Sequence, residues 1–289
     1  MPDAARWTTL VDVPALAERL RADVDGIAVV DVRHRLTDPA WGAAAYAESH
    51  IAGAVFAHLD ADLSAPVVPG VTGRHPLPTP EAAAATFGAL GIDAGVQVVA
   101  YDDIGGAFAA RLWWLLKWLG HDAAAVLDGG WPAWQAAGGP ERGGIEHRRA
   151  RTFVPRPRPA MVVDADATAA AAARGAPRVF DARAADRFAG QNETIDPVAG
   201  HIPGAASLPF AGNLGPDGRF LSAAALAARL DAALAGTPTE EAIVYCGSGV
   251  TAAHLVLAAA HAGRPLPRLY AGSWSEWITD PTRGVATGP

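Results

Sequence analysis

The sequence of 289 residues contains a single cysteine, Cys246, and lacks several other features that define protein classes. One thiol cannot form a disulfide within the chain, so we expect a reducing compartment, and the cytoplasm fits best. No apolar run approaches the ~20 residues that span a bilayer, and residues 1–7 hold no apolar core, so we expect no membrane partner and no secretory signal. The net charge of −7 and the absence of a lysine or arginine block argue against a nucleic-acid partner.

Metal ligands at a recognisable spacing are also missing. No group of histidine, cysteine or carboxylate residues has the sequence spacing of a metal site, so we expect no metal and no cofactor. The densest basic stretch, residues 147–158, is interleaved with prolines and is interpreted as a solvated linker. The 51% hydrophobic content supports ordinary packed cores, and the length suggests about two domains.

The sequence does contain an internal repeat, because three landmarks recur in the same order at nearly constant offsets. They are a strand that ends in an acid and an arginine (29–33 and 179–183), a histidine-glycine turn (50–54 and 201–205), and a glycine-tryptophan box (129–134 and 272–277). The pattern indicates two copies of one domain. The seam is rich in proline, glycine and arginine, so we divide the chain into an N-terminal domain over 1–142, a linker over 143–158 and a C-terminal domain over 159–289.

Within each copy, short apolar strands alternate with alanine-rich helices, which predicts an α/β fold with a parallel sheet covered by helices on both faces. Thr79 caps a predicted helix in the first copy, and Ser222 caps the matching helix over 223–234. The apolar run 243–245 predicts a central strand that ends directly before Cys246. Ligands of such sheets bind outside the carboxyl ends of the strands, so Cys246 lies at a candidate site.

The loop that begins with Cys246 is unusual for its glycine and serine content over residues 246–252. Two glycines let the backbone coil around the sulfur with N–H groups turned inward, and a helix that begins near Val250 adds its positive dipole end. Both effects favour the thiolate, which is the nucleophilic form. We therefore interpret Cys246 as a reactive cysteine, with a small buried hydrophobic residue as the alternative.

Comparison of the copies separates structural residues from candidate site residues. Alignment on the two tyrosines that end the central strands, Tyr101 and Tyr245, places Asp102 opposite Cys246, so the first copy has the scaffold without the nucleophile. Arg187 is not duplicated and is a candidate for binding substrate. Residues that occur in both copies are assigned structural roles, and these are His50 and His201, and Arg33 and Arg183.

Taken together, these motifs resemble the tandem rhodanese-like sulfurtransferase family. The likeness extends from about Trp7 to Trp277 and rests on the paired turns, residues 111–114 and 127–130, and the last glycine-tryptophan box. The loop is similar to that of the 3-mercaptopyruvate branch. The thiosulfate branch tends to carry basic residues where this chain has Gly247 and Ser248, and fixed cations suit a dianion such as thiosulfate.

The resemblance implies two tandem rhodanese-like domains and an enzyme that moves a sulfane sulfur. The donor would be small and anionic, with 3-mercaptopyruvate favoured, and the sulfur would pass through a Cys246 persulfide. The acceptor would be cyanide, thioredoxin or a low-molecular-weight thiol.

The resemblance also implies roles for individual residues. Cys246 is the expected nucleophile, and the Ser248 hydroxyl, with His75 and Asp60, forms a relay that moves protons. Arg187 is expected to hold the substrate carboxylate. The remaining loop residues expected to contact the substrate are Gly247, Gly249, Val250 and Thr251.

The chain departs from the family pattern at two places. Several mercaptopyruvate enzymes carry a second arginine before the second histidine-glycine turn, whereas residues 191–196 contain no basic residue, and Ala271 replaces a usual aspartate. A thiosulfate sulfurtransferase and a non-catalytic persulfide carrier or interaction protein remain alternatives. A cysteine-dependent phosphatase would need an arginine where Ala252 stands and is nearly excluded.

Overall fold

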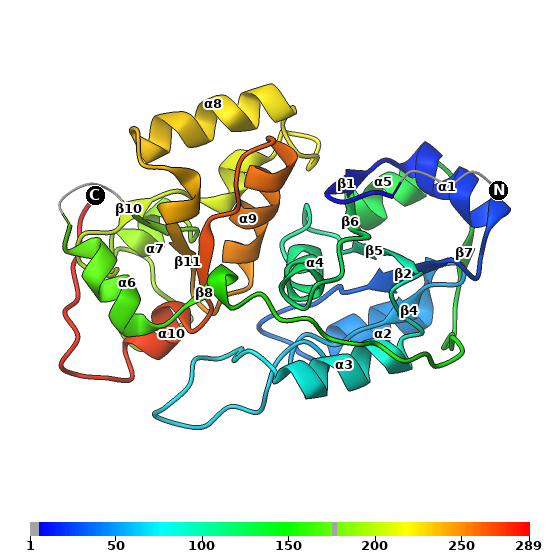
Figure 1. Ribbon diagram of the computed structural model, residues 1–289, viewed down its shortest axis with the longest axis horizontal. Helices are drawn as coiled ribbons and strands as arrows, with labels where there is room; N and C mark the ends of the chain where they lie inside the picture. Colours follow the sequence, from blue (N-terminus) through cyan, green and yellow to red (C-terminus); the bar gives the residue numbers. More distant parts are fainter. Residues whose placement is uncertain (1–5, 175–177) are drawn as a thin grey trace. The chain divides into compact units, whose positions relative to one another are not determined.

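The computed structural model describes residues 6–174 and 178–289, which divide into two compact units (Figure 1). Unit 1 contains residues 6–65, 78–158 and 217–219, and unit 2 contains the described residues of 66–77, 159–216 and 220–289. The segment Pro66–Leu77 comes from the first half of the sequence but belongs to the unit that contains Cys246.

Unit 1 is built on a five-stranded parallel sheet in the order β1-β6-β5-β2-β4. Its strands are β1 (Leu10–Val11), β2 (Ile27–Asp31), β4 (Val55–Phe56), β5 (Gln97–Tyr101) and β6 (Ala124–Leu127). Its helices are α1 (Val13–Ala22), α2 (Trp41–Glu48), α3 (Pro80–Ala89), α4 (Ala109–Trp118) and α5 (Gly130–Ala136). The short strands β3 (His50–Ile51) and β7 (Glu141–Arg142) pair antiparallel outside this sheet.

Unit 2 repeats this plan with the sheet order β10-β9-β11-β12-β8, again parallel. Its strands are β8 (Val162–Val163), β9 (Val179–Asp181), β10 (Ala206–Ser207), β11 (Ile243–Tyr245) and β12 (Arg268–Tyr270). Its α-helices are α6 (Ala165–Ala172), α7 (Ala185–Phe188), α8 (Ala223–Leu234), α9 (Thr251–His261) and α10 (Ser273–Trp277). Three 3₁₀ turns complete it, η1 (Pro159–Met161), η2 (Phe210–Asn213) and η3 (Thr239–Glu241). The predicted α/β fold of two similar copies is confirmed.

The helix starts follow the capping signals in the sequence. The Thr79 hydroxyl accepts the N–H of Ala82 at 3.2 Å at the start of α3. Ser222 does the same for Ala225 at 3.3 Å at the start of α8, so both predicted caps are confirmed.

Aromatic and aliphatic side chains fill the layer between each sheet and its helices. In unit 1 the strands pack against α1 and α5, where Trp134 is 1% exposed. In unit 2 they pack against α6 and α10 (Figure 1), and Trp274 of α10 is fully buried. Burying 150–250 Å² of one tryptophan contributes about 4–6 kcal/mol at ~25 cal/mol per Å², so these two residues anchor matching faces of the units.

The duplicated polar residues form matching structural contacts inside each unit. Arg33 pairs with the buried Asp31 at 2.7 Å, and Arg183 pairs with Asp181 at 2.6 Å. The Nδ1 atoms of the duplicated histidines lie near backbone carbonyl oxygens, His50 at 2.7 Å from Tyr46 and His201 at 2.8 Å from Phe188. The predicted structural roles of these residues are confirmed.

The basic segment that leads out of the first copy is attached to unit 1. Arg151 pairs with Asp93 at 3.0 Å, and Arg158 pairs with Asp122 at 2.7 Å. The backbone N–H of Arg151 also donates to the Gly88 carbonyl at 2.9 Å. Among the helices of the described residues, none has the length and hydropathy needed to cross a membrane.

Candidate active site

Cys246 lies between the carboxyl end of β11 and the start of α9, and it is 2% exposed. Its Sγ accepts backbone N–H groups from Gly249 at 3.1 Å and from Ser248 at 3.5 Å. Gly249 has a φ of +76°, and a Cβ there would lie 2.3 Å from the Ala271 carbonyl oxygen. Only glycine fits this turn, and the turn aims the amides at the sulfur.

The start of α10 fixes the other side of the Cys246 loop. The N–H groups of Trp274 and Ser275 donate to the carbonyl oxygens of Cys246 and Gly247 at 3.0 and 2.9 Å. The N–H of Cys246 donates to the Ser273 hydroxyl at 3.1 Å. Ser273 adopts a left-handed φ of +57°, a conformation that costs about 1–3 kcal/mol outside glycine. These contacts hold the backbone of Cys246 and Gly247 against the start of α10.

His75 lies against the loop because the segment Pro66–Leu77 packs within unit 2. A Cβ at Gly73 would lie 2.6 Å from the Gly272 carbonyl oxygen, so the backbones approach closely there. The His75 Nδ1 lies 2.7 Å from the Ser248 Oγ, and both side chains are buried. The structure thus brings together His75 and Ser248, two members of the expected relay. Ser248 follows Cys246 by two positions in the loop.

Two guanidinium groups lie beside the loop at Gly247. A Cβ at this position would lie 2.7 Å from the Arg74 Nη2 and 3.8 Å from the Arg187 Nη2. Arg187 pairs with Glu193 at 2.8 Å and with Asp196 at 3.1 Å, and Arg74 also pairs with Asp196. The absence of a side chain at Gly247 leaves room for these groups directly next to Cys246.

The two carboxylates that face these arginines are nearly inaccessible. Burial raises the pKa of Asp196 above its ordinary value, and the charge of Arg74 opposes that rise. Burial also acts to raise the pKa of Glu193, but hydrogen bonds from Arg187 and from two backbone amides leave it lowered. Arg74 keeps a buried Nε without a hydrogen-bond partner among the described residues. The two guanidinium groups are thus paired with two buried carboxylates beside the Cys246 loop.

Sequence reasoning did not identify Arg74 and Asp196, and it looked for a second arginine only in residues 191–196. Arg74 directly precedes His75 in the sequence. This position next to an expected relay residue was the signal that could have identified Arg74. Asp196 lies in the same loop as Glu193, where only the absence of a basic residue was noted.

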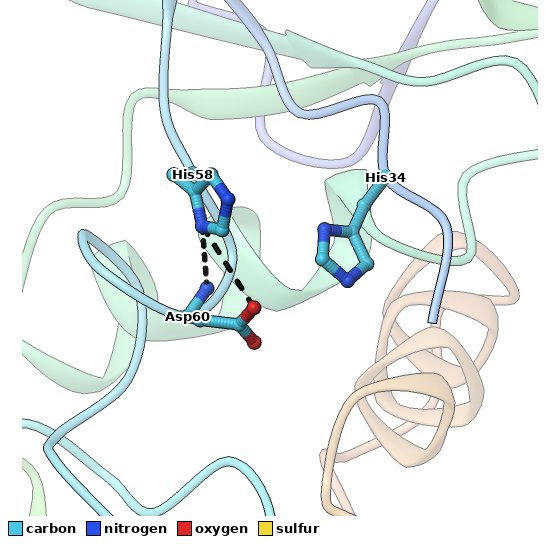
Figure 2. Close-up of side chains that lie close together, drawn as sticks. All are labelled: His34, His58 and Asp60. Carbon is cyan, nitrogen blue, oxygen red and sulfur yellow. Dashed lines mark hydrogen bonds and ion pairs between the residues drawn. The ribbon is translucent and has the colours of Figure 1, made fainter. Parts of the chain in front are cut away.

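Asp60 lies in unit 1, two residues beyond His58 and near His34 (Figure 2). Its backbone N–H donates to the His58 Nδ1 at 3.1 Å, and one carboxylate oxygen lies 4.0 Å from the same nitrogen. Its expected role in the relay with His75 stays a prediction.

The first copy shows what its equivalent loop does without a cysteine. Asp102 is fully buried, and each of its two carboxylate oxygens accepts two backbone N–H groups. The donors, at 2.7–2.9 Å, are Ile104, Gly106, Phe108 and Ala109. Burial raises the pKa of Asp102 and the four amides oppose that rise. Backbone N–H donors therefore surround Asp102 in the first copy and the aligned Cys246 in the second.

The sequence profile of the rhodanese-like domain matches residues 13–137 and 164–280, one match in each copy. The chain belongs to the rhodanese-like family. Its curated relatives include a probable 3-mercaptopyruvate sulfurtransferase of Pseudomonas aeruginosa, 52% identical over 96% of this chain and 98% of that protein. A candidate thiosulfate sulfurtransferase of Mycobacterium tuberculosis, SseB, is 42% identical over 98% of this chain and 99% of its own length.

Solved structures that superpose on this rhodanese-like chain include sulfurtransferases of the same kind. The 3-mercaptopyruvate sulfurtransferase from Leishmania major superposes with a TM-score of 0.82 at 32% identity, covering 93% of this chain and 74% of that one. SseA from Escherichia coli, a 3-mercaptopyruvate sulfurtransferase, gives 0.78 at 30% identity over 93% and 100% of the two chains. The expected family, its tandem fold and its sulfurtransferase activity are confirmed.

Proposed function

We propose that this sulfurtransferase takes the thiol sulfur of 3-mercaptopyruvate onto Cys246, where it becomes the sulfane sulfur of a persulfide, and passes it to an acceptor thiol. The observation that carries the proposal is the combination at one loop of an amide-bonded sulfur, the Ser248–His75 hydrogen bond and two guanidinium groups. Each part serves one requirement of this reaction: a nucleophile, a proton relay and a carboxylate site.

In the first half-reaction the Cys246 thiolate attacks the sulfur of the donor and forms an S–S bond. The donor C–S bond breaks, and its electron pair moves to the carbon as an enolate. The proton that leaves the donor thiol ends on that carbon, which gives pyruvate. Ser248 and His75 would move this proton, since general acid–base groups within hydrogen-bond reach accelerate such steps. Atoms and charge balance without an oxidant or reductant.

The persulfide that forms carries a negative outer sulfur in a buried loop. The N–H groups that point at the Cys246 Sγ, and the start of α9 at Thr251 behind them, would stabilise that charge. The equivalent amides around Asp102 support this role. An acceptor thiolate then attacks the outer sulfur and releases the Cys246 thiolate.

The donor carboxylate would bind between Arg74 and Arg187. Arginine offers five N–H donors and binds carboxylates through two parallel hydrogen bonds. The Arg74 Nη2 would lie 2.7 Å from a Cβ placed at Gly247, directly after Cys246. Arg74 would thus supply the second basic group that residues 191–196 lack.

The choice between 3-mercaptopyruvate and thiosulfate as the donor depends on whether the reaction includes a proton transfer. Mercaptopyruvate carries an S–H proton that must reach carbon, whereas thiosulfate releases sulfite without any proton transfer. A buried Ser248–His75 pair is useful only for the first. Thiosulfate stays the second candidate because the SseB relative carries that name at 42% identity.

The test is to treat the native chain and a Cys246→Ser variant with each donor and to weigh the intact proteins. We expect the native chain alone to gain the mass of one sulfur atom, which dithiothreitol then releases as sulfide. Steady-state kcat/KM should be higher for 3-mercaptopyruvate than for thiosulfate. A sulfur adduct on the variant, or none on the native chain, would reject the mechanism. A preference for thiosulfate would assign the second function.

The acceptor belongs to the same proposal. Thioredoxin and low-molecular-weight thiols are the proposed acceptors, and a cytoplasmic location would keep them and Cys246 reduced. Turnover with a simple thiol such as dithiothreitol would argue against a non-catalytic carrier.

A further inference from the structure

We propose that Asp196 competes with the donor for its carboxylate site and so helps to determine which donors bind. The inference rests on the proposed function, in which the donor carboxylate binds between Arg74 and Arg187. In the structure the Asp196 carboxylate takes this place: the Arg74 Nη1 contacts its Oδ1, and the Arg187 Nη2 lies 3.1 Å from its Oδ2. A bound donor carboxylate would need the same charge-assisted hydrogen bonds from the same two guanidinium groups.

The Asp196 carboxylate lies beside the loop that carries the nucleophile. A Cβ at Gly247, which directly follows Cys246, would lie 3.8 Å from the Asp196 Oδ2 and 3.8 Å from the Arg187 Nη2. The Asp196 side chain is 1% exposed, so its oxygens occupy enclosed space next to the loop rather than solvent. A donor carboxylate that reaches the two guanidinium groups must therefore displace the Asp196 carboxylate.

Asp196 is carried on an irregular segment between α7 and β10. Residues 191–199, every one of which the structure describes, contain no helix or strand, and the neighbours Ile195 and Pro197 are exposed. A proline disfavours the helical conformation in the residue before it, so Pro197 keeps the backbone at Asp196 out of a helix. The carboxylate can therefore turn from its enclosed position into water by a local change in an exposed segment.

Arg187 does not depend on Asp196 for its position. The Arg187 Nε and Nη2 both donate to the Glu193 carboxylate at 2.8–3.2 Å, and the Glu193 side chain is 2% exposed. Glu193 also accepts the backbone N–H of Asp196 at 3.0 Å. The Asp196 side chain can thus leave while Glu193 continues to hold both Arg187 and the backbone of the segment.

The charges that stay behind favour a donor with one negative charge. When Asp196 turns away, two guanidinium groups and the Glu193 carboxylate remain, with a net charge of +1. Arg183 also pairs with Glu193, but its charge is balanced by Asp181. One donor carboxylate neutralises the site, whereas a dianion such as thiosulfate leaves a negative charge that the displaced Asp196 carboxylate repels.

The comparison of the two copies separates Asp196 from the scaffold. Alignment of the histidine-glycine turns places Ala45 opposite Asp196, and Ala45 lies within the helix α2. The first copy therefore builds its sheet and helices without an acid at this position. The acid occurs in the copy that carries the thiol, as expected for a residue that acts on the donor.

A competitor and a purely structural partner of the arginines have opposite effects when they are removed. Loss of a structural partner would leave Arg74 and Arg187 misplaced and would weaken donor binding. Loss of a competitor opens the site and strengthens donor binding. If the site is open in about one-tenth of the molecules, removal of Asp196 should tighten the binding of a carboxylate about tenfold.

The first measurement is the binding of pyruvate, a carboxylate without a thiol, to a Cys246→Ser background by calorimetry. Asp196→Asn keeps the shape of the side chain and removes its charge, and Asp196→Ala removes the whole carboxylate. Asp166→Ala is the matched control, because it removes a 93% exposed carboxylate that also pairs with an arginine in unit 2. We expect both Asp196 variants to bind pyruvate about tenfold more tightly than the background, and the control to match the background.

Two further measurements connect this gain to the arginines and to the donor. In an Arg74→Gln background, Asp196→Asn should no longer tighten pyruvate binding, since a double-mutant cycle detects the shared contact. With Cys246 intact, Asp196→Asn should raise kcat/KM for 3-mercaptopyruvate about tenfold, and for thiosulfate by a larger factor because the repulsion of the second charge is also removed.

Unchanged or weaker pyruvate binding by the Asp196 variants would overturn the inference. If the native chain still transfers sulfur from 3-mercaptopyruvate in that case, the proposed function stands without it. If the native chain transfers no sulfur, the proposed function fails, and the pyruvate titrations still decide whether Asp196 competes for a carboxylate. Far-ultraviolet circular dichroism checks folding, and Asp196→Asn decides if Asp196→Ala does not fold.

Discussion

Replacement of Ser248 by alanine tests the proposed proton relay without changing the nucleophile. The change removes the hydroxyl that lies 2.7 Å from the His75 Nδ1. The Ser248 backbone N–H, which donates to the Cys246 Sγ, remains in place. We therefore expect Ser248→Ala to keep the loop around the sulfur and to remove only the proposed relay.

The expected loss depends on the donor. General acid–base groups contribute about 10²–10⁴-fold, so we expect kcat/KM for 3-mercaptopyruvate to fall about 10²–10³-fold. That range corresponds to about 2.7–4 kcal/mol of lost transition-state stabilisation. Thiosulfate requires no proton transfer, so its kcat/KM should change by less than about threefold, or ~0.7 kcal/mol.

The assay follows pyruvate for one donor and sulfite for the other, with the same thiol acceptor. Ser207→Ala, an exposed serine at the end of β10, is the matched control and should leave both rates unchanged. Equal losses with both donors would refute the assignment of Ser248 and His75 to proton transfer. They would indicate instead that the hydroxyl only positions the loop.

Three further predictions concern charge. Arg74→Gln should raise KM for 3-mercaptopyruvate about tenfold or more with a smaller change in kcat, because it removes a charged carboxylate donor, and initial-rate kinetics measure the split. Asp102→Asn should lower the free energy of unfolding by about 2–3 kcal/mol in urea titrations, since an amide places N–H donors against buried N–H groups. The Arg158 hydrogen bond lowers the pKa of Asp122 to about 2 from 3.8. Stability from this pair should be present above pH 3.8 and disappear as pH falls toward 2. Because the Asp122 side chain is 57% exposed, Asp122→Asn should cost only about 0.5–1 kcal/mol at pH 7, and this difference should vanish in acid unfolding curves.

The fold was predictable because its determinants are local or repeated. Capping residues such as Thr79 and Ser222 begin helices through their own hydrogen bonds, so sequence alone locates them. The duplicated acid–arginine pairs showed that two copies of one sheet exist. Glycine content around Cys246 predicted a loop that coils about the sulfur, and Gly249 supplies that turn.

The rest of the site depends on contacts between distant segments, which spacing does not reveal. Arg74 reaches Gly247 because the backbone at Gly73 packs against Gly272, roughly two hundred residues later. Sequence spacing around Arg187 therefore gave no indication of Arg74, the second basic group that we propose.

The segment Pro66–Leu77 precedes the seam in the sequence but packs within the unit that contains Cys246. A gene fragment that began at the seam would encode the thiol and its surrounding amides but omit the His75 imidazole and the Arg74 guanidinium, which lie beside the loop. The second copy cut out at the seam would therefore keep the sulfur but lose the segment of the first half that packs within its unit.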